Sequence, residues 1–237
     1  MSRDWTALFE AGLPAMTADL EALVRLESPS DDADRVTAAA EWVRDRLRER
    51  GVAAETRGCP PRGDALLASV GAAEGGTLLL GHLDTVWPVG SLARNPFAVR
   101  DGRATGPGVF DMKAGIVAGM AALAALAEEP APPSASLLLV PDEEIGTAAS
   151  RALLLSEARR HECVLVLEPS LEGAAKVARK GTGLFEVALT GRPAHAGLEP
   201  EKGASALQEL ARLLLFLEGL GDAALGTTVT PTLAQAG

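Results

Sequence analysis

The feature that most limits the fold of this chain is an alternation of short apolar segments with helical segments. The segments that read as strands, short and apolar on both faces, are residues 64–71, 76–84, 134–144 and 163–170. The segments with apolar residues at helical spacing are residues 4–26, 28–51, 112–129 and 147–160. Strands that are apolar on both faces need helices on both sides, so the pattern predicts an α/β fold with a mostly parallel sheet.

The pattern changes near residue 180. Residues 183–191 alternate like a half-exposed strand, residues 201–220 have helical spacing, and residues 227–237 resemble the start of another strand. We therefore predict two domains, the larger at residues 1–179 and part of a smaller α+β domain at residues 180–237.

Charge and composition exclude some classes of partner. The sequence has 22 Lys and Arg against 32 Asp and Glu, a formal charge of −10, which argues against nucleic acid and anionic membranes as partners. The N-terminus lacks the apolar core of a secretory signal, and we expect no membrane-spanning helix. Cys59 and Cys163 lack a CxxC spacing, so we expect two buried free thiols in a cytoplasmic protein.

Polar residues follow the predicted strands where their carboxyl ends should meet. His82 and Asp84 end one strand, Glu143 and Glu144 follow the next, and Glu168 ends the third. A glycine-rich turn places a further acid, Asp111, before the helix at residues 112–129. Ligands of open α/β sheets bind beyond the carboxyl ends of strands, and carboxylates with imidazole are metal ligands, so we predict a metal site there.

Each of these residues also has a simpler explanation when it is considered alone. A lone histidine on an apolar strand is more often a satisfied core residue than a ligand. Asp111 fits equally well as a cap of the helix that follows it. The acids at residues 142–144 could form an ordinary charged turn. The occurrence of suitable ligand atoms at four separate positions favours the metal site.

Five motifs in this order carry a resemblance to a known family: "GHLDTVWP", "GPGVFDMKAG", "PDEEIG", "LEP" and "GRPAHAG". The sequence resembles the co-catalytic zinc peptidases, which include glutamate carboxypeptidase, acetylornithine deacetylase, succinyl-diaminopimelate desuccinylase and aminoacylase. Residues 181–207 are most similar to the glutamate carboxypeptidase branch. The resemblance implies a zinc-dependent hydrolase that cleaves an amide bond of a small peptide or N-acyl amino acid.

The resemblance also implies a role for each site residue. His82, Asp111 and Glu168 would bind one zinc ion, while Asp111 and Glu144 would bind a second; cobalt or manganese would suit the same ligands. Asp84 would hold the second ring nitrogen of His82, as carboxylates commonly do for metal-bound histidines.

The catalytic base follows from the same resemblance. Glu143 would be the general base that takes a proton from the attacking water and passes it to the leaving amine. In the family, the peptide bond that here joins Asp111 to Met112 is cis.

The smaller domain would supply one catalytic residue. In the family the histidine that matches His195 reaches the active site of a partner subunit, so the resemblance implies a homodimer formed through this lid domain. His161 has no counterpart in the family, and we expect it at the surface.

One ligand of the family pattern has no match in this sequence. The second zinc ion has a further histidine ligand near the C-terminus of family members, whereas this sequence has no histidine after His195. We therefore expect a truncated chain, and the alternative to an active hydrolase is an impaired relative that acts as a metal-binding or dimerising module.

Overall fold

The structure is a computed structural model that describes residues 3–72 and 74–236. The chain divides between Lys176 and Val177 into two units. The division falls three residues before the predicted domain boundary.

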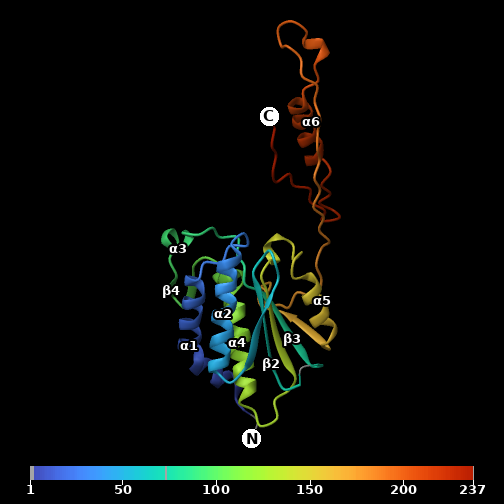
Figure 1. The fold of residues 1–237 in the computed structure, drawn as a ribbon. Helices are drawn as coiled ribbons and strands as arrows, with labels where there is room; N and C mark the ends of the chain where they lie inside the picture. Colours follow the sequence, from blue (N-terminus) through green and yellow to red (C-terminus); the bar gives the residue numbers. More distant parts are fainter. Residues whose placement is uncertain (1–2, 73, 237) are drawn as a thin grey trace. The chain divides into compact units, whose positions relative to one another are not determined.

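The first unit contains a five-stranded sheet and its helices (Figure 1). Its five sheet strands are β1 (Ala53–Gly58), β2 (Asp64–Val70), β3 (Thr77–His82), β6 (Ala135–Val140) and β7 (Cys163–Val166). Its helices are α1 (Trp5–Arg25), α2 (Ala33–Glu49), α3 (Ser91–Arg94), α4 (Ala114–Ala127) and α5 (Arg151–Arg159). A small hairpin of β4 (Ala98–Arg100) and β5 (Arg103–Thr105) and two short helical turns, η1 (Val109–Lys113) and η2 (Glu143–Ile145), complete it.

The sheet has the strand order β1-β2-β6-β3-β7. Strand β2 is antiparallel to both of its neighbours, whereas β6, β3 and β7 are mutually parallel. Four strands therefore point one way and only β2 points the other, which confirms the predicted α/β fold with a mostly parallel sheet. In this register His82 lies beside Val140, and Leu80 lies beside Val166, so three strands end together at one edge.

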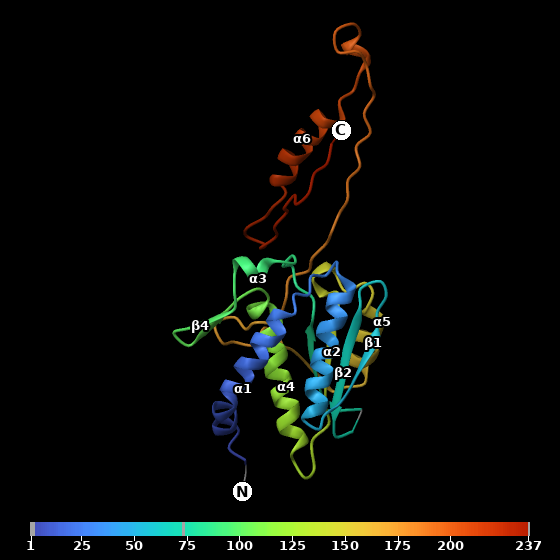
Figure 2. The same ribbon diagram turned by 60° about the vertical axis from the view of Figure 1, so that its left-hand side comes forward.

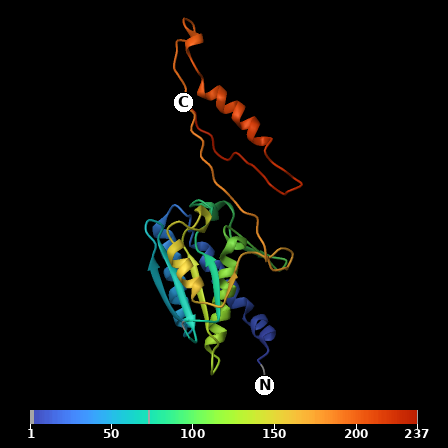
Figure 3. The ribbon, with the colours of Figure 1, turned by 90° about the vertical axis from the view of Figure 1, so that its right-hand side faces the viewer.

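Helices cover both faces of the sheet, as Figures 2 and 3 show from two sides. Leu137 and Leu139 of β6 pack in the core beneath α1, α2 and α4, while Leu138 and Val140 pack against the α5 side. Successive residues of a strand point to opposite faces, so a strand between two helical layers must be apolar throughout. All six residues of β6 are buried.

The start of each long N-terminal helix is fixed by an aspartate. Asp4 accepts a hydrogen bond from the Ala7 N–H at the start of α1, and Asp32 accepts one from the Arg35 N–H at the start of α2. Helix α2 ends at Glu49, and Gly51 follows it with φ of +78°, a conformation that glycine adopts readily after a helix.

The segment Val109–Ala127 is apolar and long enough to span a membrane by length and composition, which we did not expect from the sequence. Half of its most apolar window is buried within the protein. Ile116, Met120 and Leu123 of α4 are fully buried in the main core, as in the core helix of a folded domain.

The second unit contains a short turn, η3 (Pro200–Lys202), and one helix, α6 (Ala206–Glu218). Ser205 caps α6 by accepting a hydrogen bond from the Gln208 N–H. The predicted strands at residues 183–191 and 227–237 are wrong for the described residues, and residue 237 lies outside them. A strand needs a hydrogen-bonded neighbour, and within the described part of this unit residues 183–191 have none; Leu184 is 96% exposed.

Candidate metal centre

His82 is the last residue of β3, and its side chain is only 1% exposed. Its main-chain N–H donates to the sulfur of Met112 at 3.3 Å. The sulfur and methyl of Met112 occupy the space above Gly81, where an added Cβ would lie 2.9 Å from the Met112 Cε. Gly81 therefore allows Met112 to pack directly behind the histidine.

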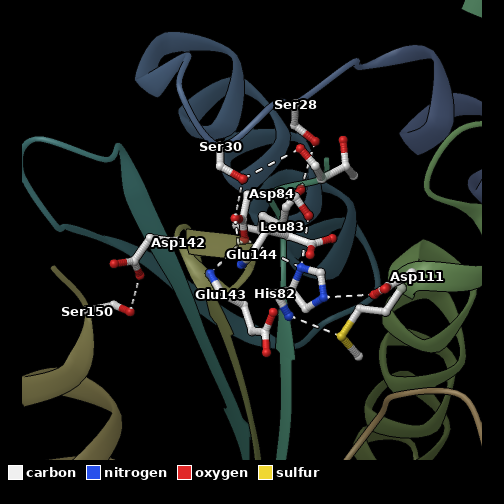
Figure 4. A network of polar contacts seen from close by, with 12 residues as sticks. Ser28, Ser30, His82, Leu83, Asp84, Asp111, Asp142, Glu143, Glu144 and Ser150 are labelled. Atoms are coloured by element: carbon white, nitrogen blue, oxygen red, sulfur yellow. Dashed lines mark hydrogen bonds and ion pairs between the residues drawn. The ribbon is translucent and has the colours of Figure 1, made fainter. Parts of the chain in front are cut away.

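The two ring nitrogens of His82 point to different neighbours: Nδ1 to Asp84, and Nε2 to Asp111 (Figure 4). Nδ1 lies 2.8 Å from the main-chain oxygen of Asp84, which can only accept a hydrogen bond, so Nδ1 carries a proton. Nε2 lies 3.1 Å from Asp111 Oδ1 and 3.3 Å from Glu168 Oε1. Nε2 and the two carboxylate oxygens therefore converge, and Nε2 without its proton would be an acceptor as they are.

Two sets of side chains converge on His82 closely enough to hold a metal ion. One set is His82, Asp111 and Glu144, and the other is His82, Glu143 and Glu168; within each set the ligand atoms lie within 4.8 Å of one another. The structure thus brings together the four predicted metal ligands and the predicted base. The resemblance implies that Glu168 shares a metal ion with His82 and Asp111, whereas these distances group Glu168 with His82 and Glu143.

Asp84 is fully buried beside the histidine, and its carboxylate makes more contacts than the predicted one. Oδ1 lies 3.4 Å from His82 Nδ1, farther than the main-chain oxygen of the same residue. The carboxylate accepts hydrogen bonds from the Glu143 N–H at 3.0 Å and the Glu144 N–H at 3.2 Å. The hydroxyl of Ser30 donates to it at 2.6 Å. Asp84 therefore connects the histidine to the turn that carries both glutamates.

Asp111 is not a helix cap. Helix α4 begins at Ala114, and the residue at its cap position is Lys113, with no side-chain hydrogen bond to the helix. The peptide bond between Asp111 and Met112 is cis, as the resemblance implies. The next residue, Lys113, is 2% exposed, and its Nζ donates to the main-chain oxygens of Leu23 and Leu26. These contacts attach the Asp111 segment to the end of α1.

Burial and neighbouring charges shift the pKa values of three residues of the cluster. Burial, followed by the charge of Asp111, raises the pKa of Glu144 above its usual value. Burial acts to lower the pKa of His82, but the Asp84 carboxylate, with a contribution from Glu168, outweighs it and raises this pKa to about 9. Burial acts to raise the pKa of Asp84, and the contacts with His82 and Ser30 lower it overall.

One atom of the cluster is buried without a partner. Among the described residues, Glu144 Oε1 is the buried side-chain oxygen that has no hydrogen-bond partner. A buried carboxylate oxygen without a donor is costly unless a cation binds it. The unpaired oxygen, the facing acceptors and the mixture of imidazole with carboxylates all fit a divalent metal ion of the zinc type.

The other two histidines belong to other segments of the chain. His195 belongs to the second unit; its Nδ1 accepts hydrogen bonds from the N–H groups of Gly197 and Leu198, which leaves the ring proton on Nε2. His161 is half-buried rather than at the surface, because its ring contacts the main-chain oxygen of Glu157 and the buried hydroxyl of Ser136.

Sequence reasoning did not identify several supporting residues. Ser30 lies 54 residues before Asp84, and its segment was interpreted only as the start of a helix. Asp142 was noted only as part of a charged turn, although its carboxylate is 1% exposed. In the sequence, Ser30 and Asp142 are small polar residues next to a helix start and a strand end. Such residues are too common at these places to indicate a supporting role.

Comparison with known proteins assigns the chain to a family. The model of peptidase family M20/M25/M40 matches residues 78–231, which include every residue of the cluster around His82 and also His195. The chain belongs to this family.

The family assignment agrees with individual relatives. The chain is 33% identical to carboxypeptidase G2 of Pseudomonas sp. strain RS-16 over 240 residues, which is 97% of this chain and 58% of that protein. The chain thus spans a little more than half the length of this curated relative.

Solved structures agree with the fold. A tripeptidase from Staphylococcus aureus superposes with a TM-score of 0.61 at 17% identity, covering 87% of this chain and 56% of that one. The aminopeptidase PepT from Bacillus cereus superposes with a TM-score of 0.58 at 19% identity, covering 84% and 55%. The fold of the chain is therefore that of M20 peptidases, a family of metal-dependent enzymes.

Proposed function

We propose that the chain forms the metal-binding part of a peptidase that hydrolyses an amide bond of a small peptide or N-acyl amino acid. The observation that carries this proposal is the set of acceptor atoms around His82 Nε2. Asp111 Oδ1 and Glu168 Oε1 lie 3.1 and 3.3 Å from it, so two carboxylates converge on one imidazole nitrogen. Carboxylate oxygens and an imidazole nitrogen that converge in this way could share one divalent cation.

The ligand assignment that we propose follows the family resemblance and differs from the two sets of converging side chains described above. His82, Asp111 and Glu168 would bind one zinc ion, and Asp111 with Glu144 would bind a second. Bound zinc would supply a Lewis acid that polarises the scissile carbonyl and favours deprotonation of water near neutral pH. The unpaired Oε1 of Glu144 supports its assignment as a ligand.

Glu143 would act as the general base. Its main-chain N–H is fixed by Asp84 Oδ1 at 3.0 Å, and its side chain enters the same cluster as His82 and Glu168. Its carboxylate would take a proton from the attacking water and deliver it to the nitrogen of the leaving amine. This transfer moves one proton and leaves Glu143 ready for the next cycle.

His195 would donate a hydrogen bond to the oxygen that becomes negative as the amide carbonyl is attacked. Its Nδ1 is already occupied by two main-chain N–H donors, so the proton needed for this role is on Nε2. In the arrangement that we propose, this histidine serves the metal centre of a partner subunit, and the second unit forms the dimer.

The relatives indicate a broad class of substrate. The similarity to a carboxypeptidase supports removal of a C-terminal residue, and the cluster itself is suited to amides in general. Which amino acid is removed is a question for a substrate panel of N-acyl amino acids and dipeptides.

The test is the conversion of Glu143 to glutamine. We expect Glu143→Gln to abolish amine release from the panel while the zinc content stays that of the parent, because the amide cannot accept the proton. Glu41→Gln, on the exposed face of α2, is the matched control and should keep full activity. Parent-like activity of Glu143→Gln would refute the assignment of the base.

A further inference from the structure

The turn that carries Glu143 and Glu144 is followed by a loop that folds back onto Asp142. Asp142 Oδ2 accepts a hydrogen bond from the Ala149 N–H at 2.7 Å, and Oδ1 accepts one from the Ser150 hydroxyl. The main-chain oxygen of Asp142 also accepts a hydrogen bond from the Thr147 N–H at 2.7 Å. Three contacts to one residue thus close the loop between β6 and α5.

The closed loop leaves little freedom to the two glutamates within it. The Gly146 N–H donates to the Glu143 main-chain oxygen at 2.9 Å, and Gly146 has φ of +95°, a conformation that favours glycine. On the other side, Asp84 accepts hydrogen bonds from the N–H groups of Glu143 and Glu144. Figure 4 shows the turn between these two buried carboxylates, Asp84 and Asp142.

Ser150 has an unusual partner for a residue at a helix start. It occupies the cap position of α5, yet its side chain does not cap the helix, unlike those of Asp4, Asp32 and Ser205. Its hydroxyl is directed instead to Asp142, and Ser150 itself is fully buried. The contact therefore attaches the start of α5 to the end of β6, and the glutamate turn is the segment held between them.

We propose that Asp142 and Ser150 are a pair of positioning residues for the metal-binding turn. This inference rests on the proposed function, because it assigns the pair to the residues argued above to be base and ligand. Neither residue belongs to the two sets of side chains that converge on His82. They act by fixing where the main chain of Glu143 and Glu144 lies relative to His82.

The experiment compares Asp142→Asn and Ser150→Ala with a matched control in the full chain. Asp142→Asn loses an acceptor oxygen, and Ser150→Ala loses the donor. The control is Asp19→Asn: Asp19 is 2% exposed and joins α1 to α2 through Arg46 and Arg50, remote in sequence from the turn. All variants are measured for thermal unfolding, for zinc affinity by competition with a chelator, and for amide exchange in residues 142–150.

We expect about a tenfold loss of zinc affinity in Asp142→Asn and in Ser150→Ala, as is usual when a group that orients a metal ligand is removed. Amide exchange at residues 143 and 144 should accelerate in both. Asp19→Asn should lower the unfolding temperature without either effect.

The inference is overturned if the two variants bind zinc as tightly as the parent while their unfolding temperatures fall like that of Asp19→Asn. A parent chain that binds no zinc would refute the proposed function separately. In that case the positioning role is tested by amide exchange alone. Faster exchange at residues 143 and 144 in Asp142→Asn and Ser150→Ala than in Asp19→Asn supports the role, and equal exchange rates in all three variants overturn it.

Discussion

The ring of His82 donates its Nδ1 proton to the main-chain oxygen of Asp84 at 2.8 Å, while the Asp84 carboxylate lies 3.4 Å from the same nitrogen. A single residue thus orients the histidine through its main chain and uses its side chain to hold the Glu143–Glu144 turn. The position of one ligand and the position of the base are fixed by adjacent atoms of Asp84.

The carboxylate of Asp84 should consequently be needed for metal affinity even though the main chain orients the ring. Asp84→Asn has one acceptor oxygen where two are used, so one N–H of the turn or the Ser30 hydroxyl loses its partner. We expect a 10–100-fold loss of zinc affinity, measured by chelator competition. Asp45→Asn, on the exposed surface of α2, is the control. An unchanged zinc affinity in Asp84→Asn would contradict this expectation, because the contact between His82 and the main-chain oxygen of Asp84 would then be enough for metal binding.

Gly115 should not tolerate a side chain. A Cβ on this residue of α4 would lie 2.2 Å from the main-chain oxygen of Leu167, the residue before Glu168. We expect Gly115→Ala to destabilise the protein by about 1–3 kcal/mol and to lower zinc affinity by displacing Glu168. Urea unfolding and chelator competition measure the two effects.

Gly12 provides the matched substitution in another helix. A Cβ there meets nothing within 4 Å, so Gly12→Ala in α1 should stabilise the protein by about 0.5–1 kcal/mol through helix propensity. Equal stabilisation by Gly115→Ala would contradict the close contact between Gly115 of α4 and the main chain of Leu167.

The two cysteines should differ sharply in reactivity. Cys59 is 4% exposed, and burial raises the pKa of its thiol, whereas Cys163 lies on the exposed edge strand β7. Iodoacetamide at pH 8 should therefore label Cys163 and leave Cys59 unmodified, because only an accessible thiolate reacts. Peptide mass spectrometry measures the labelling, with labelling in urea as the control for both thiols. Equal labelling of the native protein would contradict the burial of Cys59.

The sequence was sufficient to predict the sheet and the site because both rest on short-range patterns. Apolar strands between helices predicted the α/β fold. Polar residues that follow the strands, with one acid before a helix, predicted a site that the structure brings together: His82, Asp84, Asp111, Glu143, Glu144 and Glu168. The carboxyl ends of parallel neighbours meet at one edge, so residues far apart in sequence could be placed together without knowing any distance.

Other features depend on partners that a local pattern does not contain. The strand β1 was missed because only Ala54 among its residues is buried, as is usual for an edge strand with charged residues. Cys163 was expected to be buried, but β7 is the other edge of the sheet and its residues are exposed. Within the described residues, the strands predicted at 183–191 and 227–236 do not form, because a strand requires a hydrogen-bonded partner.

The central claim is that His82 anchors a metal site, and zinc analysis of the purified chain tests it most directly. After dialysis against zinc and removal of excess metal, the parent should retain at least one zinc per chain, and His82→Ala should retain none. His161→Ala is the matched control, since His161 is bonded to Ser136 and Glu157 and should leave the zinc content unchanged. A parent without zinc, or a His82→Ala variant with the zinc content of the parent, would contradict the account.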